Sequence, residues 1–366
     1  MKRLFATLLF AMVPAFASAQ VTPAAGFTPP DDTPVIRIGM TLFPNYVVQT
    51  TPDVTDVDGN LVNKSAFDVG RAYLNITGNV SHVVAFRITP DISRETSTTP
   101  SLNGSLVFRI KYAFAQFNLD DWMARGSWAR LGIQQTPWVD FEEGIYRYRF
   151  QGTVFPERVA LPTSLSSSDA GASFHYNLPS NYGDFHVGIY NGENYAKTDV
   201  NNQKAIQVRG TVRPFATRAP LLRGLRAHVF YDSDHYAKND ERKRLLGSLT
   251  YEQARLNAGF DYLDAKDQPL ATAADVHGRG YSFWATPRWP KADGSSWEAL
   301  VRYDHWTPST AASGQQQNRR IIGGSYWFPH QGNVSTAILI DNDAQIFRNM
   351  TTAPVKTIGV HGLINF

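Results

Sequence analysis

The chain has 366 residues, no cysteine and a formal net charge of +3. If Lys2 and Arg3 leave with an N-terminal leader, the net charge falls to +1, which argues against a nucleic-acid-binding protein. The lack of cysteine excludes a disulfide framework and a thiolate metal site.

Aromatic residues make up 13% of the chain, yet the mean hydropathy is only −0.29. After the first 19 residues, no run approaches the roughly 18 apolar residues of a membrane helix. This combination favours strands that turn only every second residue toward lipid. A soluble secreted β-sandwich is also rich in aromatic residues and is the alternative.

The N-terminus has the pattern of a secretory signal peptide. Residues 1–19 combine Lys2 and Arg3 with a short apolar stretch and the small-residue site Ala17-Ser-Ala19, so cleavage is expected before Gln20. Residues 20–34 are rich in proline and small residues and are predicted to form a periplasmic lead-in. The transmembrane β-barrel is expected to occupy residues 35–366.

Alternating apolar and polar residues then predict about sixteen strands, with 14 or 18 as alternatives. The predicted ranges are 35–44, 66–78, 80–90, 104–118, 127–138, 170–178, 183–191, 203–214, 224–234, 242–252, 254–264, 277–288, 296–307, 318–328, 333–342 and 355–366.

The connections between these strands alternate between short and long. Tight turns on the periplasmic side and long extracellular loops are typical of a bacterial outer-membrane barrel, whereas a sandwich has no reason to alternate in this way. The longer connections are predicted at 45–65, 91–103, 139–169, 192–202, 235–241, 265–276, 308–317 and 343–354.

The final predicted strand ends on the aromatic residue Phe366. An aromatic residue at the membrane interface and a last strand that pairs with the first both suit a closed barrel. We therefore expect the protein to be located in the outer membrane of a Gram-negative bacterium. The expected partners are membrane lipid and lipopolysaccharide, periplasmic chaperones and the barrel-assembly machinery.

Alternation also assigns the two faces of each strand. In the fourth strand we expect Leu106, Phe108, Ile110, Tyr112 and Phe114 to face lipid, and Val107, Arg109, Lys111, Ala113 and Ala115 to face inward. The eighth, ninth and thirteenth strands separate in the same way: Ile206 and Val208 lie opposite Gln207 and Arg209, for example. Charged residues fall repeatedly on the inward face.

An arginine in the middle of the lipid face costs about 2–4 kcal/mol, so these basic residues are predicted to line a water-filled pore. Few carboxylates are expected on the same face. The alternative is that several of them pair with wall carboxylates such as Asp304 and Asp261. The predicted wall residues are Arg71, Arg87, Arg109, Lys111, Arg130, Arg209, Arg213, Arg226, Arg244 and Arg302.

The longest connection, 139–169, is the third long loop from the N-terminus. Folded into the lumen, it would narrow the pore, with Tyr146 and Tyr148 against the wall and Arg147 and Arg149 pointing into the pore. An exposed surface loop is the alternative. Its predicted constriction residues are Asp140, Glu142, Glu143, Arg147, Arg149 and Arg158.

Several segments carry a resemblance to a known family. The run from Arg130 to Glu143, then Phe155-Pro-Glu-Arg158, then Asp169-Ala-Gly-Ala-Ser-Phe174, resembles the phosphate-selective porin O and P family, as does the hairpin from Asp68 to Asn79. The resemblance implies a sixteen-stranded, trimeric porin. It does not imply phosphate selectivity, because lysine is sparse in the strands and the long loop carries Glu142 and Glu143.

We therefore predict a porin that lets small polar solutes and ions diffuse passively, with a mild anion preference and with phosphate or anion uptake left open. No enzymatic activity, cofactor or metal is expected, because no nucleotide loop, nucleophile elbow or metal-ligand spacing occurs. The alternatives are a structural or adhesin barrel with a plugged lumen, a soluble secreted β-protein, and a barrel enzyme with His beside Ser or Asp.

Overall fold

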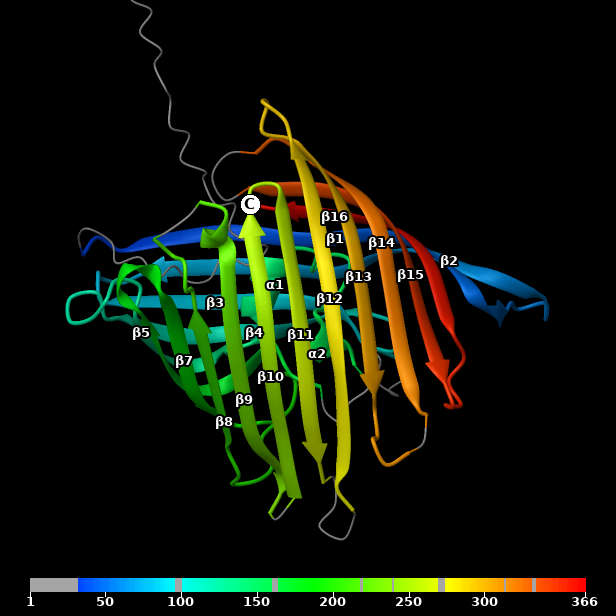
Figure 1. The fold of residues 1–366 in the computed structure, drawn as a ribbon, viewed down its shortest axis with the longest axis horizontal. Coiled ribbons are helices and arrows are strands. Elements are labelled where there is room, and N and C mark those ends of the chain that lie inside the picture. Colours follow the sequence, from blue (N-terminus) through cyan, green and yellow to red (C-terminus); the bar gives the residue numbers. More distant parts are fainter. Residues whose placement is uncertain are drawn as a thin grey trace, which may run out of the picture.

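The computed structural model describes residues 32–95, 101–159, 164–217, 220–238, 240–268, 274–312, 314–330 and 334–366. Across these residues, sixteen antiparallel strands close into one barrel (Figure 1). The predicted signal peptide and most of the predicted lead-in lie outside the described residues. In the described part of the chain, no helix is long and apolar enough to cross a membrane.

Each strand pairs with its neighbours in the sequence, and β1 pairs with β16 to complete the circle. The strands are β1 (Val35–Thr55), β2 (Leu61–Asn79), β3 (Val84–Arg94), β4 (Leu106–Asn118), β5 (Trp128–Gln135), β6 (Ser168–Asn177), β7 (Gly183–Tyr190), β8 (Ala205–Val212), β9 (Leu225–Ala237), β10 (Asp240–Gln253), β11 (Leu256–Asp267), β12 (Val276–Pro290), β13 (Ser296–Thr307), β14 (Gln316–Trp327), β15 (Ser335–Arg348) and β16 (Val355–Asn365). The predicted count of sixteen is confirmed.

Two predicted loops are wrong because the strands continue through them. β1 and β2 stay paired as far as Thr55 and Leu61, and the predicted connection 45–65 shrinks to a turn in which the Asp56 carboxylate accepts bonds from the Asp58 and Asn60 N–H groups. The β1–β2 register shifts between Leu42 and Pro44 and again between Gln49 and Val54, so the strands stay paired although the apolar–polar alternation is interrupted there. The predicted connection 235–241 is likewise too long, because β9 continues to Ala237 and β10 begins at Asp240.

A β-bulge in β4 reverses the predicted faces of half that strand. Thr89 pairs with Tyr112 and Pro90 with Ile110, so the extra residue Lys111 shifts the alternation by one. Tyr112 and Phe114 are therefore buried on the inner face, whereas Ala113 and Ala115, predicted to face inward, lie on the outer face.

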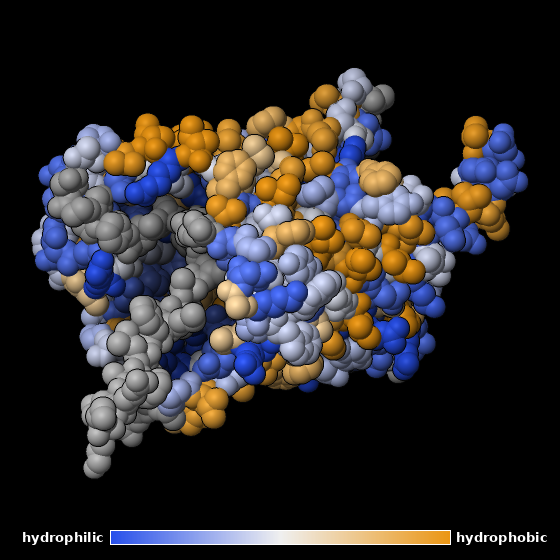
Figure 2. All heavy atoms as spheres, turned by 90° about the horizontal axis from the view of Figure 1, so that it is seen from above, coloured by the Kyte–Doolittle hydropathy of each residue, from blue (hydrophilic) through white to orange (hydrophobic). Residues whose placement is uncertain are grey.

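The outer and inner faces of the other strands divide as predicted. In β8, Ile206 and Val208 are exposed on the outside, while Gln207 and Arg209 are buried on the inside. Figure 2 shows apolar side chains over the outer wall and a hollow lined by hydrophilic residues at one mouth of the barrel. Two short helices, α1 (Val139–Tyr146) and α2 (Phe155–Arg158), lie in the connection between β5 and β6.

Candidate pore constriction

Residues 139–159 are here called the inner segment. They contact the inner face of strands that come more than 100 residues later in the sequence. Asn257 donates to the Ile145 carbonyl at 3.1 Å, and Arg302 donates to the Thr153 carbonyl at 2.8 Å. Gln151 donates to Asp341 at 2.8 Å. Because these partners come from β11, β13 and β15, the inner segment crosses the interior of the barrel.

Aromatic packing fixes one side of the inner segment to the wall. The Tyr146 ring meets Trp284 edge to face at 5.3 Å, and the Tyr148 ring meets Trp327 in the same way at 5.9 Å. Phe155 packs against Trp306. All three residues of the inner segment are almost fully buried, so this apolar contact supplies a large part of the attachment.

Glu298 on β13 is the main polar anchor for the inner segment. It is 4% exposed, accepts from the Tyr148 hydroxyl at 3.0 Å and pairs with Arg147 at 3.3 Å. The Arg147 guanidinium also stacks on Trp327, with its carbon 4.2 Å from the ring centre. The prediction that Arg147 points into the pore is therefore wrong. Arg147 ends α1 with a left-handed φ of 68°, which turns its side chain to the wall.

Four further charged residues of the inner segment have side-chain partners within the protein. Arg149 pairs with Glu143 at 2.6 Å, and both are buried, so the expectation that Arg149 points into the pore is also wrong. Asp140 accepts from the Tyr112 hydroxyl at 2.5 Å. Arg158 donates to the Gln151 side chain at 2.8 Å.

Glu142 is buried next to Trp138, whose indole N–H donates to its carboxyl group at 2.6 Å. Burial raises the pKa of Glu142 well above its ordinary value of 4.5, and the neighbouring carboxylate of Asp261 raises it further. The shift favours the protonated, neutral form, which weakens the predicted role of Glu142 as a charged constriction residue.

Five predicted cations gather on β2–β5, here called the basic wall. Arg109 donates to Asp91 at 3.1 Å, and Arg71 lies 3.6 Å from the same carboxylate. Lys111 is buried between the Tyr73 and Tyr112 rings. The set comprises Arg71, Arg87, Arg109, Lys111 and Arg130.

The other two cations of the basic wall, Arg87 and Arg130, donate to neutral side chains. Arg87 donates to Asn75 at 2.8 Å and to Thr89 at 2.9 Å. Arg130 donates to Gln116 and Gln135, both at 2.9 Å, and its guanidinium stacks on Trp128 at 3.7 Å.

The opposite side of the barrel is here called the paired wall. It carries several inward-facing carboxylates, so the expectation of few carboxylates on the inner face is wrong there. On β13 and β14, Arg302 donates to Asp304 at 2.8 Å and Arg319 to Asp343 at 2.5 Å. On β10, Arg244 donates to Asp267 at 2.6 Å and Arg242 pairs with Asp234. The alternative of wall pairing is thus correct for Arg302 and Arg244. The paired wall consists of Arg242, Arg244, Arg302 and Arg319 with their four partner carboxylates.

Three further predicted residues lie toward the ends of the strands that join at short turns. Arg209 pairs with Asp184 at 2.6 Å and donates to the Pro137 carbonyl. Arg226 pairs with Glu252 at 2.9 Å. Arg213 follows β8, and its backbone N–H donates to Tyr182.

Sequence reasoning missed Arg319 and Asp343 as polar groups of the interior and did not include Glu298, which it placed on the inward face, among the constriction residues. Alternation within the predicted strands places Glu298 opposite Trp297, so the signal was present for that residue. Among the described residues, no group of three or more His, Cys, Asp or Glu side chains could hold a metal ion.

Solved structures with the same fold are outer-membrane proteins. The outer membrane channel DcaP of Acinetobacter baumannii is 12% identical, with 93% of this chain and all of that chain covered and a TM-score of 0.57. An anion-selective porin from Comamonas acidovorans is 11% identical over 91% and 99% of the two chains, with a TM-score of 0.56. OmpT of Vibrio cholerae in its trimer form is also 11% identical, over 92% and 100%, with a TM-score of 0.56.

No curated protein sequence matches the chain. A family model, described as phosphate-selective porin O and P, matches residues 48–286, which is more than half of the chain. The barrel, its hydrophilic interior and this match agree with the resemblance seen in the sequence. The chain belongs to the phosphate-selective porin O and P family and is a porin of the Gram-negative outer membrane.

Proposed function

We propose that the protein is a passive diffusion porin in which the inner segment forms the constriction. One observation supports this proposal: the inner segment, which connects β5 to β6, makes hydrogen bonds to β11, β13 and β15. Polar solutes and ions would pass through the remaining hydrophilic space without an energy source. The pore-lining roles of the predicted wall residues are part of this proposal.

We further propose a mild preference for anions. Arg71 and Arg109 share the single carboxylate of Asp91, and their side chains are 28% and 31% exposed, so part of their charge is open to the lumen. Lysine is sparse on the inner wall, where Lys111 is almost completely buried. A general anion preference therefore fits these residues better than selectivity for phosphate.

The assembly and setting of the barrel follow as further proposals. One structural relative was solved as a trimer, which supports a homotrimer for this chain. The strand ends joined by short turns would face the periplasm, and the lead-in would precede them. Membrane lipid, lipopolysaccharide, periplasmic chaperones and the assembly machinery are the proposed partners. We propose a channel rather than an enzyme, in agreement with the match to the porin family.

Single-channel conductance and zero-current potential in a planar bilayer under a salt gradient test this function. We expect open steps and a potential that leans toward anions. Cation-selective steps would keep the pore and contradict the anion preference. A correctly inserted barrel that stays silent would overturn the porin proposal and favour a barrel plugged by its inner segment.

A further inference from the structure

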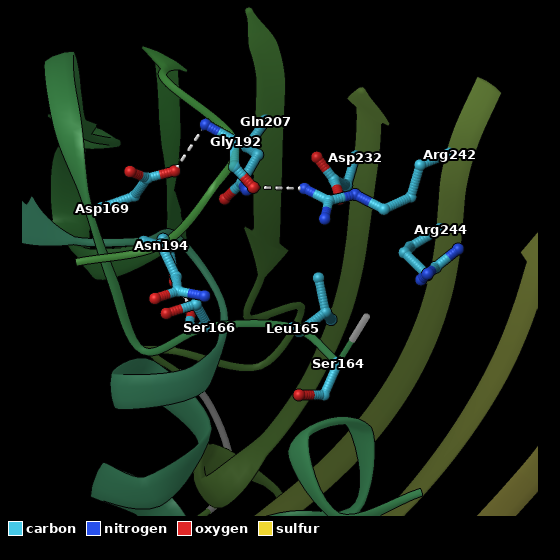
Figure 3. Close-up of a pocket in the computed structure, with 11 residues that line it drawn as sticks. Ser164, Leu165, Ser166, Asp169, Gly192, Asn194, Gln207, Asp232, Arg242 and Arg244 are labelled. Atoms are coloured by element: carbon cyan, nitrogen blue, oxygen red, sulfur yellow. Dashed lines mark hydrogen bonds between the residues drawn. The ribbon is translucent and has the colours of Figure 1, made fainter. Parts of the chain in front are cut away.

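Residues 191–204 connect β7 to β8, and hydrogen bonds to Gly192 fix the backbone where this connection begins. The Gly192 N–H donates to Asp169 at 2.7 Å, and Arg242 donates to the Gly192 carbonyl at 2.7 Å (Figure 3). Gly192 has a φ of +98°, and a Cβ there would lie 2.6 Å from the Asp234 carboxylate. Only glycine fits this position easily, so the backbone is clamped between β6 and β10.

From this clamp the connection reaches two strands that are not its neighbours. The Tyr195 hydroxyl donates to Asp91 on β3 at 3.4 Å, and its ring lies 4.8 Å from the guanidinium carbon of Arg109 on β4. The Tyr195 N–H donates to the Ser168 carbonyl at 3.2 Å. Because β5 and β6 separate β4 from β7, the connection crosses the inner side of the barrel in front of them.

The contact involves the most exposed cations of the basic wall. A tyrosine ring over a guanidinium covers one face of it and is attracted to its charge. Asp91, fully buried, accepts from both Arg109 and Tyr195, so the ring and the carboxylate hold Arg109 between them. The ring therefore covers the face of the Arg109 guanidinium that it stacks on, and an anion cannot contact Arg109 on that face.

We propose that residues 192–195, at the start of this connection, form a second inward-folded element and that Tyr195 is a specificity-determining residue that limits anion access to Arg109. The inference rests on the proposed porin function and adds to it a residue outside the inner segment. Truncating the ring uncovers the guanidinium, whereas removing only the hydroxyl leaves it covered.

The first test compares Tyr195→Ala and Tyr195→Phe with Tyr182→Ala, a control in a turn at the other end of the barrel. For Tyr195→Ala we expect a larger single-channel conductance and about a twofold rise in the anion-to-cation permeability ratio. Tyr195→Phe and Tyr182→Ala should match the unmodified protein. If Tyr195→Ala also matches it, the proposed role of Tyr195 is wrong.

The second test does not depend on conductance, and the chain has no natural cysteine to interfere. Tyr195→Cys is combined with Arg109→Cys, or with Phe108→Cys as a control on the outer face, where Phe108 is 70% exposed. A short bifunctional thiol reagent should crosslink only the first pair. If neither pair crosslinks, the inward position of the connection is overturned. If the first pair crosslinks in a barrel that never conducts, the porin proposal fails and the inward position stands.

Discussion

The basic wall and the paired wall lie on opposite sides of one barrel; both carry arginine on the inner face but hold it differently. In the paired wall, Arg302 and Arg319 each meet a carboxylate at hydrogen-bond distance. In the basic wall, Arg71 and Arg109 share one carboxylate, and amides or aromatic rings hold Arg87 and Arg130. Because Arg71 and Arg109 share one carboxylate and stay partly exposed, positive charge remains open to the lumen at these two residues.

The largest effect is expected at Glu298, where the inner segment is fastened to the paired-wall side. Glu298→Ala leaves Arg147 and Arg288 without their buried partner and should lower the free energy of unfolding by about 3–5 kcal/mol. Denaturant unfolding in detergent measures this change. Glu241→Gln removes a partly exposed carboxylate at the loop end; it is the control and should change the free energy of unfolding far less than Glu298→Ala does. Equal losses in both would show that Glu298 is no special anchor.

Reversing a charge on the basic wall should change ion preference most directly. Arg109→Glu should lower the anion-to-cation permeability ratio roughly fivefold, because it changes two unit charges beside the ion path. The zero-current potential reports the ratio. The double substitution Arg319→Gln with Asp343→Asn removes a complete pair and should leave the potential unchanged. If the double substitution shifts the zero-current potential more than Arg109→Glu does, the paired wall and not the basic wall sets the ion preference.

The β4 bulge gives a test of position rather than energy. Tyr112→Cys should react with a water-soluble, membrane-impermeant thiol reagent that reaches the lumen, although more slowly than an open site. Ala113→Cys should be protected from that reagent and accessible to a lipid-soluble one. The opposite pattern would mean that regular alternation continues through Lys111. Mass spectrometry of the labelled protein measures both reactions.

The smallest effect is expected from His82, in the turn between β2 and β3. Its ring lies 2.5 Å from Asp32 and 3.0 Å from Asp121, and the hydrogen bond with Asp32 raises its pKa above the ordinary 6.5. Folding favours the protonated form, so its stabilising contribution is complete below pH 6.5 and is lost as pH rises through the raised pKa. An NMR titration of the ring should show this pKa, and Asp32→Asn should lower it. A midpoint at or below 6.5 in the parent would contradict the contact.

Alternation predicted the faces of regular strands such as β8 and β13, because every second residue there has the same surroundings. It failed at Lys111 and Tyr112 because an inserted residue changes the phase without changing the composition of the strand. Asp304 is among the carboxylates that the sequence offers as partners for wall arginines, and its bond with Arg302 follows because residues two apart on a strand share a face.

Other contacts of the candidate site depend on information that is not local. The bond between Arg244 and Asp267 requires the register between β10 and β11. The contact between Arg147 and Glu298 requires the left-handed turn at the end of α1 and a partner 151 residues away. The inner segment could be recognised from its length and charge, but its attachment points could not.

The seam between β1 and β16 also has a consequence for the order of events in folding. The Thr41 hydroxyl donates to the Asn365 side chain, a bond that joins residues 324 positions apart, and the Met40 and Phe366 backbones exchange two further bonds. No nascent chain can close this circle before β16 has been synthesised and delivered. Until then β1 and the newest strand both present open edges, which readily join other chains. Closure is thus a late, slow step that exposes the unfinished sheet to aggregation.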